Sequence, residues 1–330
     1  MTATGQRCMS LNPVASHVLP FEKPIVDLVA RVRELRALAE TDKRFEAELR
    51  KLEAQCGRLA RELFADLSPW QKVQLSRHPN RPYTLDYVGH LFEDFTELHG
   101  DRAYADDAAI VAGLARYKGR RVALVGHQKG RGAKENVKRN FGMPHPEGYR
   151  KAARIYELAS RFNLPVFTFI DTPGAYPGLG AEERGQSEAI GACLAAMARA
   201  TVPIIATILG EGGSGGALAL GVANKVNVLE YGTYSVISPE GCASILWKDG
   251  SKADEAATRL KMTAPELLEL KVVDRVIEEP AGGAHQDALL AARNVDAALS
   301  EALQDLDTRS ADELVQHRYD RFRALGAFAG

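Results

Sequence analysis

The hydrophobic pattern of the chain changes near residue 80. Before that point, apolar residues recur at three- and four-residue spacing, first over 25–38 and then over 45–63. This spacing places them along one side of a helix, and the polar break at 40–42 separates the two stripes. The pattern therefore predicts two amphipathic helices that fold back on each other as an antiparallel hairpin. Because a hairpin buries little by itself, we expect it to pack on the core or to dock a partner.

Beyond residue 80, apolar residues gather into short runs that are followed by glycines and then by a helical pattern. This succession occurs at 122–132, 166–200 and 202–222, and residues 110–127 read as a β-hairpin ahead of it. Repeated strand-then-helix units predict an α/β fold with a mainly parallel sheet and helices outside. Loops that follow parallel strands gather at one edge of the sheet, so the glycine loops should meet there. A helix is expected over 85–98, capped by Thr84.

Composition excludes several classes of protein. The 330 residues are 45% hydrophobic and 26% charged with a net charge of −1, so neither nucleic acid nor a membrane is an expected partner. The four cysteines contain no C-x-x-C pair, which argues against a zinc ribbon or a disulfide scaffold. No metal site is expected in this chain, and the cysteine usage fits a reducing cytoplasm.

The segment 210–216, GEGGSGG, carries the strongest sign of a site. Glycine lets a backbone approach a ligand, the first N–H groups of a helix lack partners, and the helix dipole adds positive charge there. Such a turn binds an anion or stabilises an oxyanion. These residues leave four interpretations open. They are a turn without chemistry, a dinucleotide fingerprint at Gly210, Gly212 and Gly215, a nucleophile at Ser214, and an oxyanion hole of the Gly215, Gly216 and Ala217 amides.

Other candidate groups lie on a second glycine loop at 173–180, PGAYPGLG, and in the basic segment 126–148. A basic segment either faces solvent or binds phosphates or an acidic partner. No G-x-x-x-x-G-K-[ST] motif occurs, so phosphoryl transfer is not expected. We interpret Glu211 as a solvent-facing structural residue. The basic residues of the segment are Lys129, Arg131, Lys134, Lys138 and Arg139.

Nine strings of residues, in this order, make the sequence recognisable. From about residue 21 to near the C-terminus it resembles the α subunits of bacterial acetyl-CoA carboxylase carboxyltransferases, whereas residues 1–17 look like an extension without counterpart. The strings are RPYTLDY (81–87), GDRAYADD (100–107), GHQKGR (126–131), RNFGMPHPEGYRKA (139–152), FIDTPGAYPG (169–178), GAEERGQSEAI (180–190), GEGGSGGALALG (210–221), YSVISPEGCASILWK (234–248) and GGAH (282–285).

The resemblance implies a crotonase-like fold, a superhelix of ββα units with an N-terminal helical hairpin and C-terminal helices. It also implies carboxyl transfer from carboxybiotin, presented by a biotin carboxyl carrier protein, to acetyl-CoA, forming malonyl-CoA. The expected assembly is α2β2, with biotin carboxylase in the full complex and zinc on the β subunit. The expected divisions of the chain are 1–20 (extension), 21–80 (hairpin and linker helix), 81–300 (carboxyltransferase core) and 301–330 (C-terminal helix).

In related carboxyltransferases, amides of a glycine pair stabilise the biotin ureido oxygen. The resemblance places that pair within Gly215, Gly216 and Ala217. It also implies that the loop at 173–180 shapes the biotin cleft and that the basic segment meets CoA phosphates or the carrier protein. Two alternatives stay open: a serine hydrolase of ClpP-like fold using Ser214, and a scaffold subunit without catalytic groups. The further substrate-binding candidates are Gly174, Ala175, Tyr176, Gly178, Gly212, Gly213, Lys129, Arg131 and Lys134.

Overall fold

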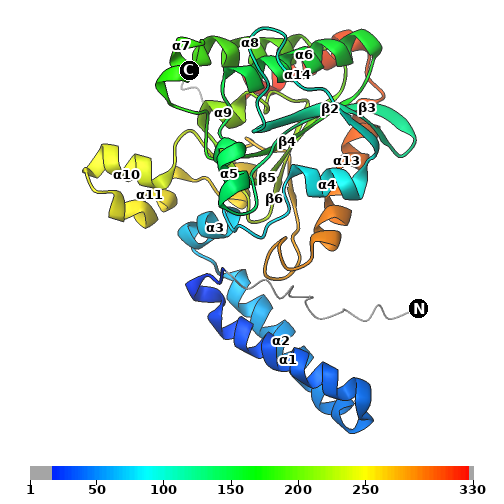
Figure 1. The fold of residues 1–330 in the computed structure, drawn as a ribbon, viewed down its shortest axis with the longest axis vertical. Coiled ribbons are helices and arrows are strands. Elements are labelled where there is room, and N and C mark those ends of the chain that lie inside the picture. Colours follow the sequence, from blue (N-terminus) through cyan, green and yellow to red (C-terminus); the bar gives the residue numbers. More distant parts are fainter. Residues whose placement is uncertain (1–16, 327–330) are drawn as a thin grey trace.

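The structure is a computed structural model that describes residues 17–326. The extension expected at 1–20 therefore lies largely outside the described residues, as do residues 327–330. Figure 1 shows a helical hairpin at one end, a sheet with helices on both faces, and a small arm of two helices that projects sideways. Among the helices of residues 17–326, none combines the length and the apolar composition that crossing a bilayer requires.

The expected hairpin is present. Helix α1 (Lys23–Thr41) runs beside α2 (Glu46–Ala65), and a short 3-10 turn after residue 41 reverses the chain (Figure 1). The apolar stripes of both helices meet in one cluster, which also includes Tyr231 from the core. The rings of Phe64 and Tyr231 lie 6.1 Å apart, so the base of the hairpin is anchored on the sheet domain.

An eight-stranded sheet forms the centre of the molecule, in the order β1-β2-β3-β4-β5-β6-β8, with β7 paired to β5. The first three strands are antiparallel, and the pairs from β3 to β8 are parallel. The strands are β1 (Glu93–Glu97), β2 (Ile110–Tyr117), β3 (Arg120–His127), β4 (Val166–Thr172), β5 (Ile204–Gly213), β6 (Lys225–Leu229), β7 (Thr233–Ser235) and β8 (Arg275–Ile277).

Alternate residues of each strand enter two different cores, as the two-residue period of a strand dictates. On β3, Ala123 and Val125 pack in the core beneath α6 and α8, whereas Val122 and Leu124 pack in the core beneath α4 and α13. The helices around the sheet are α3 (Pro69–Ser76), α4 (Thr84–Leu91), α5 (Ala133–Lys138), α6 (Pro146–Phe162), α7 (Leu179–Glu183), α8 (Gln186–Arg199), α9 (Ser214–Leu218), α12 (Ala264–Glu269), α13 (Ala288–Leu306) and α14 (Ala311–Arg323).

The helix expected over 85–98 was wrong in its second half. Helix α4 ends at Leu91, and β1 follows and pairs with β2. Thr84 is also not the cap, because its hydroxyl donates to the carbonyl of His127 at 2.5 Å. The Tyr83 N–H donates instead to Asp86 Oδ2 at 2.7 Å, which closes the first turn of α4.

The projecting arm consists of α10 (Pro239–Trp247) and α11 (Ala253–Leu260), drawn in yellow in Figure 1. Ser238 caps α10 by accepting a hydrogen bond from the Gly241 N–H at 3.1 Å. Ile245 and Leu246 on α10 are 71% and 63% exposed, and Val236 just before the helix is 78% exposed. The arm thus carries apolar side chains that the chain itself leaves uncovered.

Candidate active site

The two glycine loops meet at one edge of the sheet, as the strand order requires. Thr172 at the end of β4 pairs with Gly212 at the end of β5. A Cβ atom on Gly213 would lie 2.1 Å from the Pro173 oxygen, and one on Gly216 would lie 2.6 Å from the Ala175 nitrogen. Because no side chain fits between backbones this close, the loops form one continuous backbone surface.

This surface presents amide groups without internal partners. Gly215 and Gly216 are the second and third residues of α9, so the helix offers their N–H groups no acceptor. Within residues 17–326, we find no hydrogen bond from the N–H of Gly215, of Gly216, or of Ala175 on the opposite loop. Gly216 and Ala217 are both buried and Gly215 is half-buried, so the backbone of Gly215 is the most accessible of the three. With only five residues, α9 is too short for a large dipole, so the donors act as individual N–H groups.

Hydrogen bonds from both sides fix the loop at 173–180. The Gly174 N–H donates to Thr172 Oγ1 at 3.1 Å, and the Tyr176 N–H donates to the Pro144 carbonyl at 3.0 Å. A Cβ atom on Gly178 would lie 2.3 Å from the Tyr176 ring, so glycine is needed for that ring to pack here. The loop is therefore a preorganised wall of the site.

Lys129 links the ends of both strands. Its ammonium group lies 2.8 Å from Asp171 Oδ1 and 2.9 Å from Glu211 Oε1. Asp171 Oδ1 also accepts the Glu211 N–H at 3.1 Å. Asp171 precedes one glycine loop and Glu211 the other, so this lysine bridges the two loops directly beneath their backbones. The expectation that Glu211 faces solvent was wrong, because its side chain is only 12% exposed.

The charged groups of this network shift one another's pKa values. Burial alone would raise the pKa of Glu211, but Lys129 and Arg77 outweigh it and hold that pKa below its usual value. Burial raises the pKa of Asp171 despite the opposing effect of Lys129. Burial alone would lower the pKa of Lys129, yet the two carboxylates raise it, so the lysine stays charged. Arg77 continues the chain of ion pairs, 2.8 Å from Glu211 and 2.6 Å from Glu240 on α10.

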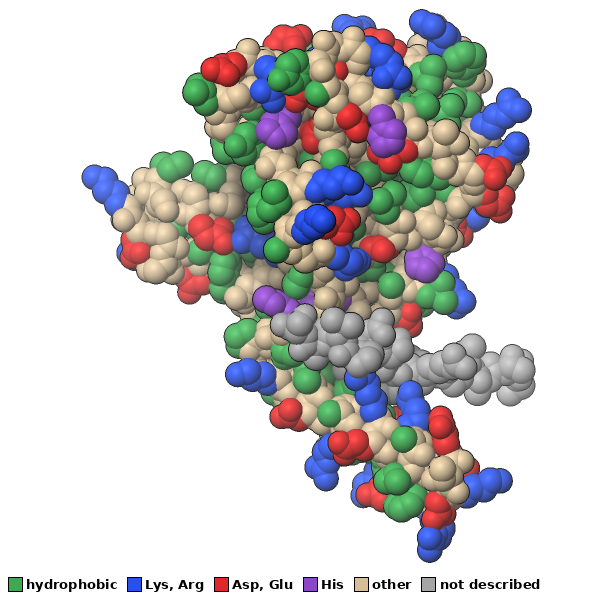
Figure 2. Space-filling model, in the orientation of Figure 1, with side chains coloured by type: hydrophobic (Ala, Val, Ile, Leu, Met, Phe, Trp, Pro, Cys, Tyr) green, Lys and Arg blue, Asp and Glu red, His purple; other side chains and the backbone are tan. Residues whose placement is uncertain are grey.

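The other basic candidates lie apart from Lys129. Arg131 donates to Asp86 at 2.6 Å, and its guanidinium stacks on the Tyr83 ring at 4.7 Å. Lys134 and Lys138 are exposed on α5, in the region where Figure 2 shows Lys and Arg side chains near the middle of the visible face. The basic segment is thus divided between a buried lysine and a surface group, and only the surface group is free to meet an anionic partner.

An apolar cavity of about 400 Å³ opens beside the glycine turn. Its lining includes Ser214, Gly215, Tyr234, Val236 and Phe322 of α14. Ser214 is exposed with φ of 53°. No hydrogen bond among residues 17–326 connects it with a histidine, which a serine nucleophile would need. The cavity therefore adjoins the Gly215 backbone, and Ser214 beside it lacks the partner that would activate it.

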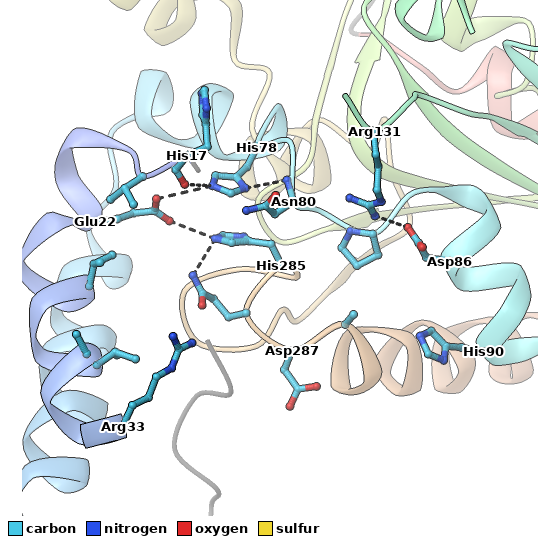
Figure 3. A pocket seen from close by; sticks show the side chains of 17 residues that line it. His17, Glu22, Arg33, His78, Asn80, Asp86, His90, Arg131, His285 and Asp287 are labelled. Atoms are coloured by element: carbon cyan, nitrogen blue, oxygen red, sulfur yellow. Dashed lines mark hydrogen bonds and ion pairs between the residues drawn. The ribbon is translucent and has the colours of Figure 1, made fainter. Parts of the chain in front are cut away.

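A second polar cluster lies away from this edge, where the base of the hairpin meets the core (Figure 3). Glu22 Oε2 accepts the Leu19 N–H at 2.8 Å, and Glu22 Oε1 lies 3.3 Å from His285 Nε2. His78 stacks on His285 with ring centroids 4.0 Å apart and an interplanar angle of 20°. A cavity of about 640 Å³ adjoins the three side chains.

Glu22, His78 and His285 are the group of described residues whose ligand atoms come within 4.8 Å of one another. A metal ion must lie in the ring plane of each histidine that binds it, and two nearly parallel stacked rings cannot share such a point. His78 Nδ1 also accepts the Asn80 N–H at 3.2 Å, which leaves the proton on Nε2, beside the His17 carbonyl. The cluster therefore connects the residue just before α1 with two loops of the core.

Sequence reasoning missed the ion-pair chain and the Glu22 cluster. Their members come from positions up to 263 residues apart, and each alone looks like an ordinary charged or histidine residue. The signal available in the sequence was limited: Asp171 and Glu211 each stand at the end of an apolar run, just before a glycine loop. Nothing in the local pattern pairs them with Lys129.

Comparisons with known proteins find relatives over nearly the whole chain. The profile of the family "Acetyl co-enzyme A carboxylase carboxyltransferase-like" matches residues 18–326. The acetyl-coenzyme A carboxylase carboxyl transferase subunit alpha of Sorangium cellulosum is 69% identical over 317 residues, covering 96% of this chain and 100% of that protein. The subunit of the same name from Edwardsiella ictaluri is 57% identical, covering 96% and 99%.

Solved structures show the same fold at low identity. A transcarboxylase 12S structure superimposes with a TM-score of 0.57 at 23% identity, covering 69% of this chain and 42% of that one. A Pseudomonas malonate decarboxylase hetero-tetramer in complex with coenzyme A superimposes with a TM-score of 0.55 at 18% identity, covering 66% and 88%. The crotonase-like fold expected from the sequence is thereby confirmed.

Proposed function

Because this chain belongs to the acetyl-coenzyme A carboxylase carboxyltransferase family, we propose that it is the α subunit that transfers a carboxyl group from carboxybiotin to acetyl-CoA, forming malonyl-CoA. The observation that carries the proposal is the group of unpaired amides of Gly215, Gly216 and Ala175 where the two glycine loops meet. The serine hydrolase alternative has no such support at Ser214.

In the proposed reaction, the N–C bond of carboxybiotin breaks and releases CO₂, and negative charge develops on the ureido oxygen. Fixed N–H donors aimed at that oxygen lower the barrier, and each one contributes about 3–4 kcal/mol when it is preorganised. The biotin nitrogen then takes a proton from the acetyl-CoA methyl group, and the resulting enolate attacks CO₂. This sequence needs no further base from the protein, and the apolar cavity beside Gly215 fits the hydrocarbon part of biotin.

The site is open on one side, so a partner subunit would complete it. We propose that a β subunit supplies the CoA pocket and covers the apolar arm, and that the carrier protein approaches over α5. Lys134 and Lys138 are exposed there and can meet an acidic surface. Lys129 does not take part in this contact. Its role in the proposal is to hold the two amide-bearing loops together.

The experiment is a matched pair of glycine substitutions in the complex co-purified with a β chain. Gly216→Ala places its methyl 2.6 Å from the Ala175 nitrogen, whereas Gly215→Ala meets nothing nearer than Ile190 at 3.7 Å. Carboxyl transfer between malonyl-CoA and biocytin is followed by release of acetyl-CoA. We expect Gly216→Ala to lower kcat at least about 100-fold and Gly215→Ala to lower it less than about fivefold.

Both variants must still co-purify with the β chain for the comparison to count. Equal kcat values for Gly216→Ala and wild type would contradict the assignment of the amides. Absence of transfer in the wild-type complex would contradict the proposed function itself.

A further inference from the structure

His127 is a buried polar side chain without an assigned role. It is the last residue of β3 and is fully buried. Its ring lies beside the backbone of Gly216 and Phe169, but neither ring nitrogen has a hydrogen-bond partner among the described residues. A buried imidazole without a partner is destabilising, so its presence directly behind the glycine turn needs a physical reason.

The carbonyl of Gly216 is the complementary group. Just after α9, the Ala219 N–H donates to the Gly215 carbonyl at 3.0 Å, and the Leu220 N–H donates to the Ala217 carbonyl at 3.1 Å. The first of these hydrogen bonds reaches back four residues and the second reaches back three. The Gly216 carbonyl lies between the two acceptors and accepts no backbone hydrogen bond among the described residues. The unpartnered ring of His127 and the unused carbonyl of Gly216 thus belong to neighbouring residues behind the turn that carries the amides.

We propose that His127 is a positioning residue, whose ring N–H donates to the Gly216 carbonyl and thereby fixes the orientation of the Gly215 and Gly216 amides during carboxyl transfer. The inference rests on the proposed function, because it concerns the same amides. Catalytic hydrogen bonds that are long or poorly aligned in a free enzyme often tighten only when substrate binds, and we place the His127–Gly216 hydrogen bond in that class.

The surroundings keep this imidazole neutral and in place. Burial and the nearby Lys129 ammonium lower the pKa of His127 to about 3, so the ring carries one N–H donor at neutral pH. The Thr84 hydroxyl holds the His127 carbonyl at 2.5 Å. In the β2–β3 ladder, His127 is aligned with Ile110. The backbone of His127 is therefore fixed beside the glycine turn.

Three substitutions test the proposal in the co-purified complex with the β chain. His127→Asn keeps a donor at the place of Nδ1, His127→Gln keeps one at the place of Nε2, and His127→Leu keeps the volume without a donor. We expect His127→Leu to lower kcat about 10- to 100-fold with unchanged KM for malonyl-CoA and biocytin. We expect one of the two amide variants to recover most of the lost kcat, which identifies the donating nitrogen.

Thermal unfolding separates positioning from packing. A residue that only fills space would lower Tm when replaced, whereas His127→Leu should leave Tm unchanged or raise it, because it removes an unpaired polar group. Wild-type kcat in His127→Leu, or an equal loss in all three variants, overturns the proposal. If Gly216→Ala is inactive while His127→Leu is fully active, the role of the amides stands and that of His127 falls. An inactive wild-type complex overturns both.

Discussion

Buried charges at the edge of the sheet determine how well the glycine loops are held. Lys129 is 13% exposed and contacts two carboxylates that are less exposed still, 3% for Asp171 and 12% for Glu211. An ion pair at this depth adds little net stability relative to an apolar replacement, but removal of one partner leaves an uncompensated charge. The lysine is therefore more important for the position of the loops than its contribution to stability would suggest.

Replacing Lys129 by Met should destabilise the chain by about 3–5 kcal/mol, because Asp171 and Glu211 remain buried without a cation. The effect should shrink as pH falls from 7 to 5, since the carboxylates can then take up protons, and it should also shrink in the Lys129→Met, Glu211→Gln double variant. Urea unfolding followed by circular dichroism measures both. Lys134→Met is the control, and we expect a change within about 0.5 kcal/mol because that side chain is exposed. Equal unfolding free energies for the two single variants would contradict the argument.

At the scale of elements, the hydrophobic pattern predicted most of what forms. The stripes over 25–38 and 45–63 became α1 and α2, and the apolar runs before the glycine loops became β4 and β5. The pattern failed over 92–98, where Phe92 and Phe95 pack against the core from the end of α4 and from a strand, although their spacing also fits a helix. Pairing with β2 decided the outcome, and such a contact between distant segments leaves no trace in the local sequence.

Only the part of the candidate site that is built from backbone groups could be proposed from the sequence. Glycine clusters after apolar runs signal loops that approach a ligand, so the sequence suffices to propose Gly215 and Gly216 as donors. The partners of those loops could not be proposed in this way, because Lys129, Asp171 and Glu211 meet through the order of the strands. Ala175 is among the substrate-binding candidates, but the contact of its amide with Gly216 could not be derived, because it depends on how closely the two loops pack.

The contact between hairpin and core should weaken in acid. Burial and the nearby His285 lower the pKa of His78 to about 4 from its ordinary value near 6.5. Between these two pH values, the unfolded chain binds a proton at His78 that the folded chain does not bind. Stability from this residue is thus complete above pH 6.5 and is lost as pH falls toward 4. The lowered pKa of Glu22 acts in the same direction at lower pH. Between pH 7 and 5 we expect a loss of about 2 kcal/mol from His78.

Urea unfolding at both pH values tests this loss, with His78→Asn beside the wild type. The variant lacks the titrating ring. Between pH 7 and 5, its unfolding free energy should therefore fall by about 2 kcal/mol less than that of the wild type. His90 lines the same cavity but is exposed, and His90→Asn should keep the wild-type pH dependence. An identical pH dependence of His78→Asn and wild type would refute the role of the stacked pair.

At the scale of the whole molecule, the projecting arm and the site are physically connected. Arg77, at the end of α3, contacts Glu240 on α10 at 2.6 Å and Glu211 below the glycine turn at 2.8 Å. Glu211 in turn contacts Lys129 at 2.9 Å. A partner that covers the arm would therefore contact an element that is ion-paired, through Arg77, to the residues that hold the amide-bearing loops. This fits a site that one subunit builds only in part.

The apolar residues of the arm should then be needed for assembly and not for folding. Ile245→Glu introduces a charge at a side chain that is 71% exposed, so the unfolding free energy should change by less than about 0.5 kcal/mol. In a subunit interface the same charge would be buried without a partner, which costs several kcal/mol and weakens association at least about 100-fold. Leu289→Glu on α13 is the matched control, since Leu289 is 49% exposed and lies away from the arm. Analytical ultracentrifugation of each variant with the β chain measures the association, and tight assembly of Ile245→Glu would show that the partner binds elsewhere.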